Sequence, residues 1–261
     1  MLIDALSLKF KPDDYRAKLP VFDYLADLGS FKLRRPVTVF VGENGIGKSS
    51  LLAGVASDLG CSPEGGRMDD PDEIVPRSPI RCVTDKVIQR AYFLRAEKHE
   101  HLIARGDSSD ERAGRSTLSQ NVDLSRRSHG QSVFDMLYEH INGQGVYVLD
   151  EPESGLSVIR QLALVGEIAQ AVDRGAQVII ATHSPILLAC PGADIVELND
   201  TGFERIAFDE AGDVAEALLL DQRTAVAHVD VAVVAQQDRV RLVFKPFQRL
   251  EDIAAMAGGD I

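Results

Sequence analysis

The segment Gly42–Ser49, GENGIGKS, carries the residue types that bind a polyphosphate. It satisfies the pattern GxxxxGK(S/T) and lies between a β-rich run, VTVFV, and a run with helical apolar spacing, SSLLAGVA. A triphosphate is held by inward-pointing backbone N–H groups, and the glycines let the backbone wrap closely around it. Lys48 would reach the β and γ phosphates, and the Ser49 hydroxyl would coordinate Mg²⁺. The segment therefore predicts a phosphate-binding loop between a strand and a helix.

Two adjacent acids, Asp150 and Glu151, follow the apolar run VYVL. Buried carboxylates are costly unless a metal or hydrogen bonds offset the cost, so acids at the carboxyl end of a buried strand predict a cation site. Asp150 would hold Mg²⁺, directly or through water. Glu151 would polarise a water for in-line attack on the γ phosphate. The alternative is that Asp150 caps the following helix and Glu151 is solvated.

His183 stands just past another apolar run, in the segment IIATHSP. Because the carboxyl ends of parallel strands share one edge of a sheet, His183 would lie near the two acids and the loop. It would hydrogen-bond the γ phosphate and the attacking water, with Thr182 and Ser184 nearby. The alternative is a histidine with a purely structural role.

Strand and helix patterns alternate along the chain. The strand-like runs are VTVFV, VYVLD, QVIIA and the weaker DIVEL, and helical spacing is found after the loop, at 131–142 and at 158–174, where Gly175 is the expected stop. This alternation predicts an α/β fold with a mainly parallel central sheet flanked by helices. Residues 61–78, rich in Gly, Pro, Asp and Glu, predict a mobile surface segment. The runs AHVDVAVVAQ and RVRLVFKPF near the end are strand-like, with no predicted place in the sheet.

Composition excludes several classes of protein. The chain has 261 residues, 45% of them apolar and 26% charged, with a formal net charge of −12. Collagen-like, mucin-like and wholly disordered chains are excluded. No run reaches the roughly 18 apolar residues of a membrane-spanning helix, and the N-terminus lacks the pattern of a secretory signal, so we expect a cytoplasmic protein without membrane insertion. Three scattered cysteines predict neither a disulfide framework nor a zinc site.

GENGIGKSS, LDEP and ATHS, in this order and with SHGQS at 128–132, resemble the ABC-type ATPases over about 37–198. Within that family, FLRAE, SHGQS, LDEPESGLS, RQLAL and IIATHSPILLA make the chain most similar to small stand-alone bacterial ATPases, AAA family ATPases related to SMC and break-repair ATPase heads. Only about eighty residues separate the loop from SHGQS, so the long coiled-coil arms of those heads have no room.

The resemblance implies a P-loop NTPase fold of the ABC-ATPase type. It places the ATPase domain at 1–220, with a signature-bearing helical part at about 85–142, and leaves 221–261 as a C-terminal extension of unassigned role. Ser128, Gly130 and Gln131 would close over the γ phosphate of ATP held by another subunit, which implies a homodimer formed on ATP binding. Taken alone, SHGQS is a helix cap.

The loop motif and the resemblance together give the expected site. ATP would be bound by Gly42, Asn44, Gly45, Gly47, Lys48, Ser49, Ser50, Ser128, Gly130 and Gln131; catalysis would use Lys48, Glu151 and His183; Mg²⁺ would be held by Ser49 and Asp150. Two assignments stay open. The metal-sensing residue is one of Gln89, Arg95 and Glu97, and the adenine contact is sought among Tyr15, Phe22 and Tyr24.

The expected function is ATP binding and Mg²⁺-dependent ATP hydrolysis by a stand-alone ABC-type ATPase in DNA metabolism or defence. Ser157 stands where transport subunits carry an aspartate, which weakens the first alternative, the ATP-binding subunit of an ABC membrane transporter. The second alternative is a nucleotide-gated binding module with little turnover. Nucleic acid is a candidate partner because arginines cluster at 105–127, although a solvated loop is the simpler explanation of them. The identity of a protein partner beyond a second copy of the chain is left open.

Overall fold

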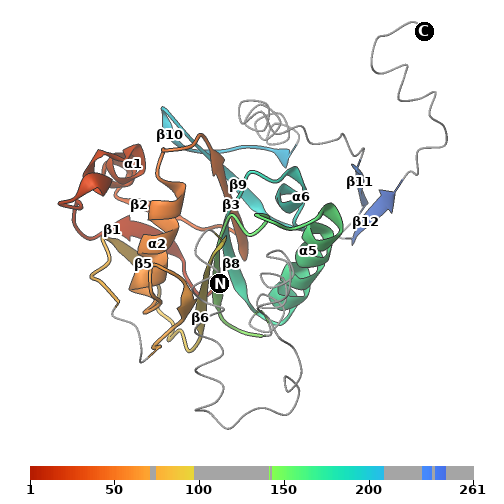
Figure 1. The fold of residues 1–261 in the computed structure, drawn as a ribbon, viewed down its shortest axis with the longest axis horizontal. Coiled ribbons are helices and arrows are strands. Elements are labelled where there is room, and N and C mark those ends of the chain that lie inside the picture. Colours follow the sequence, from red (N-terminus) through yellow and green to blue (C-terminus); the bar gives the residue numbers. More distant parts are fainter. Residues whose placement is uncertain (71–74, 97–140, 142, 209–230, 237–238, 245–261) are drawn as a thin grey trace, which may run out of the picture. The chain divides into compact units, whose positions relative to one another are not determined.

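The computed structural model describes residues 1–70, 75–96, 141, 143–208, 231–236 and 239–244 (Figure 1). The chain divides into two compact units, Met1–Gln222 and Arg223–Ile261. The predicted helix at 131–142 falls almost wholly outside the described residues, as does most of the predicted signature-bearing part. The domain division given by the resemblance therefore stays a prediction.

A seven-stranded sheet forms the centre of the first unit, in the order β10-β9-β3-β8-β7-β6-β4. Its strands are β3 (Val37–Gly42), β4 (Gly66–Arg67), β6 (Ala91–Arg95), β7 (Val146–Asp150), β8 (Gln177–Ala181), β9 (Asp194–Asn199) and β10 (Gly202–Arg205). The five inner strands run parallel, and only the outer strands β10 and β4 pair antiparallel with their neighbours. The mainly parallel α/β sheet predicted from the sequence is confirmed.

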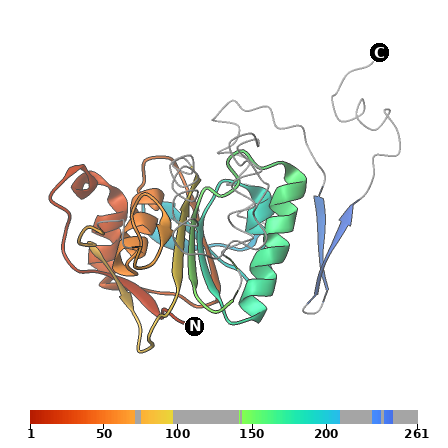
Figure 2. The ribbon, with the colours of Figure 1, turned by 60° about the horizontal axis from the view of Figure 1, so that its bottom comes forward.

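Helices cover both faces of this sheet. Helix α2 (Lys48–Asp58) packs on one face, where Leu52 and Val55 share a core with Phe40 and Val148. Helix α5 (Val158–Asp173) packs on the other face, where Ile168 shares a second core. The two helices lie on opposite sides of the strands in Figure 2. Every residue of β3, β7 and β8 is buried, as expected for parallel strands covered on both faces.

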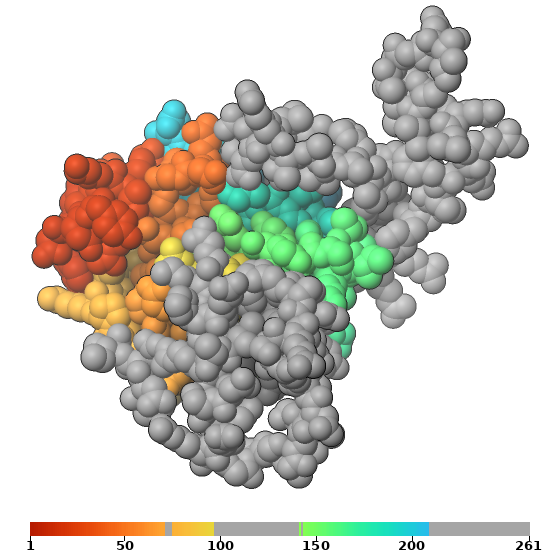
Figure 3. Space-filling view, in the orientation of Figure 1, coloured from red at the N-terminus to blue at the C-terminus, as the bar shows by residue number. Residues whose placement is uncertain are grey.

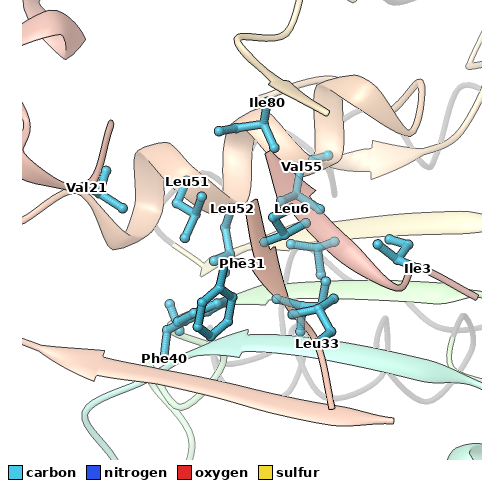
Figure 4. Close-up of a cluster of buried hydrophobic side chains, with 14 of the residues drawn as sticks. Ile3, Leu6, Val21, Phe31, Leu33, Phe40, Leu51, Leu52, Val55 and Ile80 are labelled. Carbon is cyan, nitrogen blue, oxygen red and sulfur yellow. The ribbon is translucent and has the colours of Figure 1, made fainter. Parts of the chain in front are cut away.

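A second, three-stranded antiparallel sheet lies beside α2 and was not predicted. It consists of β2 (Ser30–Lys32), β1 (Ala5–Leu8) and β5 (Ile80–Val83), in that order. Its inward side chains, such as Leu6 and Ile80, join Leu51 and Leu52 of α2 in the cluster of Figure 4. Helix α1 (Pro20–Leu28), preceded by a 3-10 turn at Tyr15–Lys18, completes this region.

The prediction of a surface segment without packed elements at 61–78 is wrong for part of the residues that the structure describes there. Cys61 and Ser78 are buried, and Gly66–Arg67 forms the edge strand β4 against β6. The Ser78 hydroxyl donates to the Gly54 carbonyl over 2.6 Å and accepts from the Ile80 N–H over 2.9 Å. A composition rich in turn residues is therefore compatible with a packed segment, because backbone pairing and the Ser78 hydroxyl add to the few apolar contacts of Cys61 and Met68.

The remaining elements are short. Helix α5 ends at Asp173, and Gly175 follows with φ +91°, close to the expected stop. Helix α6 (Pro185–Leu188) follows β8. In the second unit, β11 (Val231–Gln236) and β12 (Arg239–Phe244) pair antiparallel, so the two strand-like runs near the end are confirmed as strands of a separate two-stranded sheet. Within the described ranges, no helix has the length and apolar character needed to cross a membrane.

Candidate functional site

The loop between β3 and α2 depends on its glycines in two ways. Gly42, Gly45 and Gly47 have φ of +132°, +84° and +111°, values that side chains rarely adopt. A Cβ at Gly42 would lie 2.1 Å from the Leu198 carbonyl oxygen, and one at Gly47 would lie 2.4 Å from Cγ1 of Val21. Nothing lies within 4 Å of a Cβ at Gly45, so there the backbone angle alone favours glycine. The loop thus packs closely against β9 at Gly42 and against α1 at Gly47, and it leads directly into the N-terminus of α2.

Lys48, the first residue of α2, spans this loop with its side chain. Its ammonium donates to the carbonyl of Gly42 over 2.6 Å and to that of Glu43 over 3.0 Å, and the residue is 5% exposed. Burial lowers the pKa of Lys48, and the nearby carboxylates of Glu151 and Asp150 oppose that shift. A buried cation therefore lies beside the amides of the loop, which suits an anionic ligand.

Asp150 ends β7 and meets the loop. The Ser49 hydroxyl donates to Asp150 Oδ1 over 3.0 Å, and Arg95 Nε, at the end of β6, lies 3.8 Å from Asp150 Oδ2. Asp150 is 4% exposed. It does not cap a helix, because α5 begins only at Val158 and its N-cap is Ser157.

The Ser49 hydroxyl and the Asp150 carboxylate fit Mg²⁺. Both are hard oxygen donors, and Mg²⁺ typically takes one or two protein oxygens and completes its shell with water and substrate phosphates. The described residues contain no group of three or more His, Cys, Asp or Glu side chains that would form a protein-only metal cage. The donor set therefore suits a cation that arrives with a phosphate ligand.

Glu151 adopts a left-handed backbone conformation, with φ +49°. Its N–H donates to the Ala181 carbonyl over 2.9 Å, which anchors the turn to the end of β8. Its side chain is 34% exposed, and Oε1 lies 3.8 Å from Nε2 of His183. A left-handed glutamate is uncommon and costs about 1 kcal/mol or more, and such strain concentrates at functional sites.

His183 is buried and neutral near pH 7. Burial, assisted by the charge of Lys48, lowers the pKa of His183 to about 4. Neither ring nitrogen has a hydrogen-bond partner, although both are buried. Because buried polar atoms are almost always paired, an imidazole in this state has unused capacity to bind a ligand.

Strand order brings these groups together. β8 lies between β3 and β7, and Ala181 is the register partner of both Phe40 and Asp150. β7 and β8 consequently end level and β3 runs two residues further, so the segments that follow the three strands lie at one edge of the sheet. The structure thus brings the loop, Asp150, Glu151 and His183 together, as the sequence predicted.

The other candidate residues divide into three groups. Asn44 is exposed in the loop and Ser50 is half-buried in the first turn of α2. Ser128, Gly130, Gln131 and Glu97 lie outside the described residues. Of the two metal-sensing candidates that are described, Arg95 reaches Asp150, whereas Gln89 precedes β6 and lies toward the opposite end of that strand.

Three aromatic candidates for an adenine contact differ in exposure. Tyr15 is 74% exposed, Phe22 is 1% exposed within the core, and the ring of Tyr24 lies 3.8 Å from a Cβ placed at Gly202. The ring of Phe22 is therefore not accessible for stacking on a base.

An apolar side chain of the same unit is exposed near the site. Ile159, in the first turn of α5, is 77% exposed, and the segment from β7 into α5 reaches the surface in Figure 3.

Sequence reasoning missed two side chains at this edge. Glu153 Oε1 accepts from the His183 N–H over 2.7 Å. Gln161 Nε2 donates to the Leu156 carbonyl over 3.1 Å, and Gln161 Oε1 accepts from the Ser184 hydroxyl over 2.6 Å. Residues 153 and 183 are too far apart in the sequence for a spacing rule to connect them. The only sequence signal for the turn that carries Glu153 was the run LDEPESGLS.

Comparisons with known proteins concern part of the chain. A family model described as "AAA domain, putative AbiEii toxin, Type IV TA system" matches residues 122–189, which include Asp150, Glu151 and His183. No curated protein matches the chain significantly. Among solved structures, one described as "An inward-facing conformation of a putative metal-chelate type ABC transporter" is similar with 18% identity and a TM-score of 0.39, over 69% of this chain and 76% of that chain.

Proposed function

We propose that this protein binds ATP with Mg²⁺ and hydrolyses it as a stand-alone ABC-type ATPase. The observation that carries the proposal is the contact of 3.0 Å between Ser49 Oγ and Asp150 Oδ1, with Glu151 and His183 at the adjoining strand ends. A phosphate-binding loop, a cation-holding carboxylate, a second acid and a neutral imidazole at one edge form the set of groups that phosphoryl transfer to water requires.

Binding would rest on the loop. Its amides and the N-terminus of α2 would hold the phosphate oxygens, and the Lys48 ammonium would exchange the carbonyls of Gly42 and Glu43 for β and γ phosphate oxygens. Ser49 and Asp150 would hold Mg²⁺, which neutralises charge on the phosphates when bound. Arg95 would keep the Asp150 carboxylate oriented.

Hydrolysis would rest on Glu151 and His183. The Glu151 carboxylate would accept a proton from a water as its oxygen attacks the γ phosphorus and the bond to the ADP oxygen breaks. The imidazole of His183 would hydrogen-bond the γ phosphate and the attacking water beside it. Its lowered pKa of about 4 keeps the ring neutral at neutral pH.

The biological setting is inferred from the family model that matches residues 122–189. The description of the matching family model names a toxin of a TA system, which favours DNA metabolism or defence over transport. In the proposed cycle, ATP joins two chains head to tail, with Ser128, Gly130 and Gln131 of each chain closing the site of the other. The exposed Ile159, next to the turn that carries Glu151, is a suitable contact for such a neighbour.

The test compares the wild type with Glu151→Gln, measuring phosphate release and solution mass with and without Mg·ATP. We expect Glu151→Gln to retain ATP binding, to slow hydrolysis by about 10²-fold or more and to accumulate as an ATP-dependent dimer. Glu167→Gln is the matched control, because Glu167 lies on α5, outside the loop and the strand ends that carry the proposed site. Hydrolysis by Glu151→Gln at the parental rate would show that the assigned role of Glu151 is wrong. ATP binding by the wild type without turnover or dimer would instead identify a nucleotide-gated binding module.

A further inference from the structure

Two turns at the edge of the sheet are tied together by side chains that the proposed chemistry does not use. The first turn, residues 151–157, follows β7, and the second, residues 182–184, follows β8. Glu153 reaches from the first turn to the His183 N–H over 2.7 Å. Gln161, in the first two turns of α5, joins the Leu156 carbonyl to the Ser184 hydroxyl over 3.1 and 2.6 Å.

Backbone hydrogen bonds within the first turn link its residues to one another. The Ser154 N–H donates to the Glu151 carbonyl over 3.0 Å, and the Leu156 N–H donates to the Glu153 carbonyl over 2.8 Å. A tie at Glu153 therefore fixes the backbone that carries Glu151.

The second turn is held on both sides of His183. The Thr182 N–H donates to the Phe40 carbonyl of β3 over 3.2 Å, and the Ser184 hydroxyl accepts from the Ile186 N–H at the start of α6. Between these anchors, the His183 N–H has Glu153 as its acceptor. Its imidazole makes no hydrogen bond of its own, so the position of the ring depends on the backbone.

The buried carboxyl group of Glu153 carries a desolvation cost that a purely structural hydrogen bond does not require. Burial raises the pKa of its carboxyl group, which the nearby Thr182 hydroxyl and the His183 N–H oppose only in part, and Oε2 is buried without a hydrogen-bond partner. Burying a carboxyl group is costly, so its hydrogen bond to the His183 N–H has a use beyond packing.

We propose that Glu153 is a positioning residue that sets the separation between Glu151 and His183, with Gln161 as a second, weaker tie. This inference rests on the proposed ATPase function. The two groups act on the same water and γ phosphate, and their side chains are 3.8 Å apart. A displacement of about 1 Å at a reacting centre reduces rates by up to about 10²-fold, so the tie acts on turnover more than on binding.

The experiment measures kcat for ATP hydrolysis and Kd for ATP in Glu153→Ala, Glu153→Gln and a control, Glu167→Ala on α5. We expect Glu153→Ala to lower kcat by about 10-fold or more while Kd changes by less than about 3-fold. Glu153→Gln keeps an acceptor oxygen and should restore kcat to within about 3-fold of the wild type. Thermal unfolding of each variant separates loss of fold from loss of rate.

A second arm asks whether Glu153 acts through His183. In a His183→Ala background, measured by single turnover, Glu153→Ala should lower the rate by less than about 2-fold more. If Glu153→Ala does not fold, Gln161→Leu provides the same test, with an expected loss of about 3-fold in kcat.

The inference is overturned if the wild type hydrolyses ATP and Glu153→Ala keeps the wild-type kcat, or if Glu153→Ala lowers the rate equally in the presence and absence of the His183 imidazole. Failure of the proposed function itself looks different, because the wild type would then not hydrolyse ATP, whether or not it binds it.

Discussion

Buried polar groups at the two ends of the central parallel strands differ in whether they have hydrogen-bond partners within the protein. At the carboxyl end, His183 has two buried ring nitrogens without partners, Glu151 has a left-handed backbone and Lys48 is a buried cation. At the amino end, Gln177 opens β8 with 1% exposure. Its Oε1 accepts from the N–H groups of Leu2 and Ile3 over 2.8 and 2.7 Å, and its Nε2 donates to the Ile3 carbonyl over 3.0 Å.

This difference separates groups that hold the fold from groups available to a ligand. Gln177 fastens the start of the chain to the sheet and uses its donor and acceptor on the protein itself. The carboxyl end stores strain and unused hydrogen-bonding capacity, which a folded protein retains where function requires it. β8 is therefore fastened to the start of the chain at its amino end, and its carboxyl end leads to the groups of the proposed site.

Substitution at Lys48 should produce the largest effect, and on function alone. We expect Lys48→Ala to reduce ATP turnover by about 10³-fold, because the cation facing the phosphates is lost. Its free energy of unfolding should change by no more than about 1 kcal/mol, because relief of the desolvation of the buried charge offsets the loss of a donor to the carbonyls of Gly42 and Glu43. Phosphate release and denaturant unfolding measure the two quantities. A large loss of stability would erase the contrast between the two ends.

Substitution at Gln177 should do the reverse. Gln177→Met keeps a long unbranched side chain but leaves three backbone groups of Leu2 and Ile3 without partners, so the free energy of unfolding should fall by about 2–3 kcal/mol. The matched control is Gln89→Met, because Gln89 is exposed. ATP turnover of folded Gln177→Met should stay within about 2-fold of the wild type. Impaired turnover with unchanged stability would place function at the amino end as well.

The smallest expected effect is a pH dependence that His183 imposes on stability. Its pKa is about 4 in the folded protein against an ordinary value of 6.5, because of burial and the charge of Lys48, with Glu151 the nearest opposing charge. Between these two pKa values the unfolded chain binds more protons, so stability is present above pH 6.5 and is lost as the pH falls toward 4. Between pH 7 and 5, the wild type should lose about 1–2 kcal/mol more than His183→Gln in urea unfolding. Parallel pH profiles of the two proteins would contradict this.

The carboxyl end of the sheet could be predicted from sequence because each of its parts is a local pattern. A glycine-rich loop, two acids and a histidine each follow an apolar run, and the geometry of parallel sheets places them together. The strands and the helices after the loop and at 158–174 were found for the same reason.

The rest depends on partners distant in sequence. Gln177 bonds to residues 174 and 175 positions away, and Glu153 to one 30 positions away. The antiparallel sheet has strands of three and four residues, too short to show a period of two. The segment at 61–78 was wrongly predicted in part because several of its contacts use backbone groups and the Ser78 hydroxyl, which composition does not reveal.

Strand order also has a consequence for protein synthesis. β8 is the last of the three site-bearing strands to leave the ribosome, yet it is the middle one in the sheet. A nascent chain that ends before Gln177 already contains the loop and both acids, but β3 and β7 then lack the strand that separates and aligns them. The proposed site can therefore form only after β8 has been translated. A chain interrupted upstream of β8 carries the loop and both acids without the strand that aligns them.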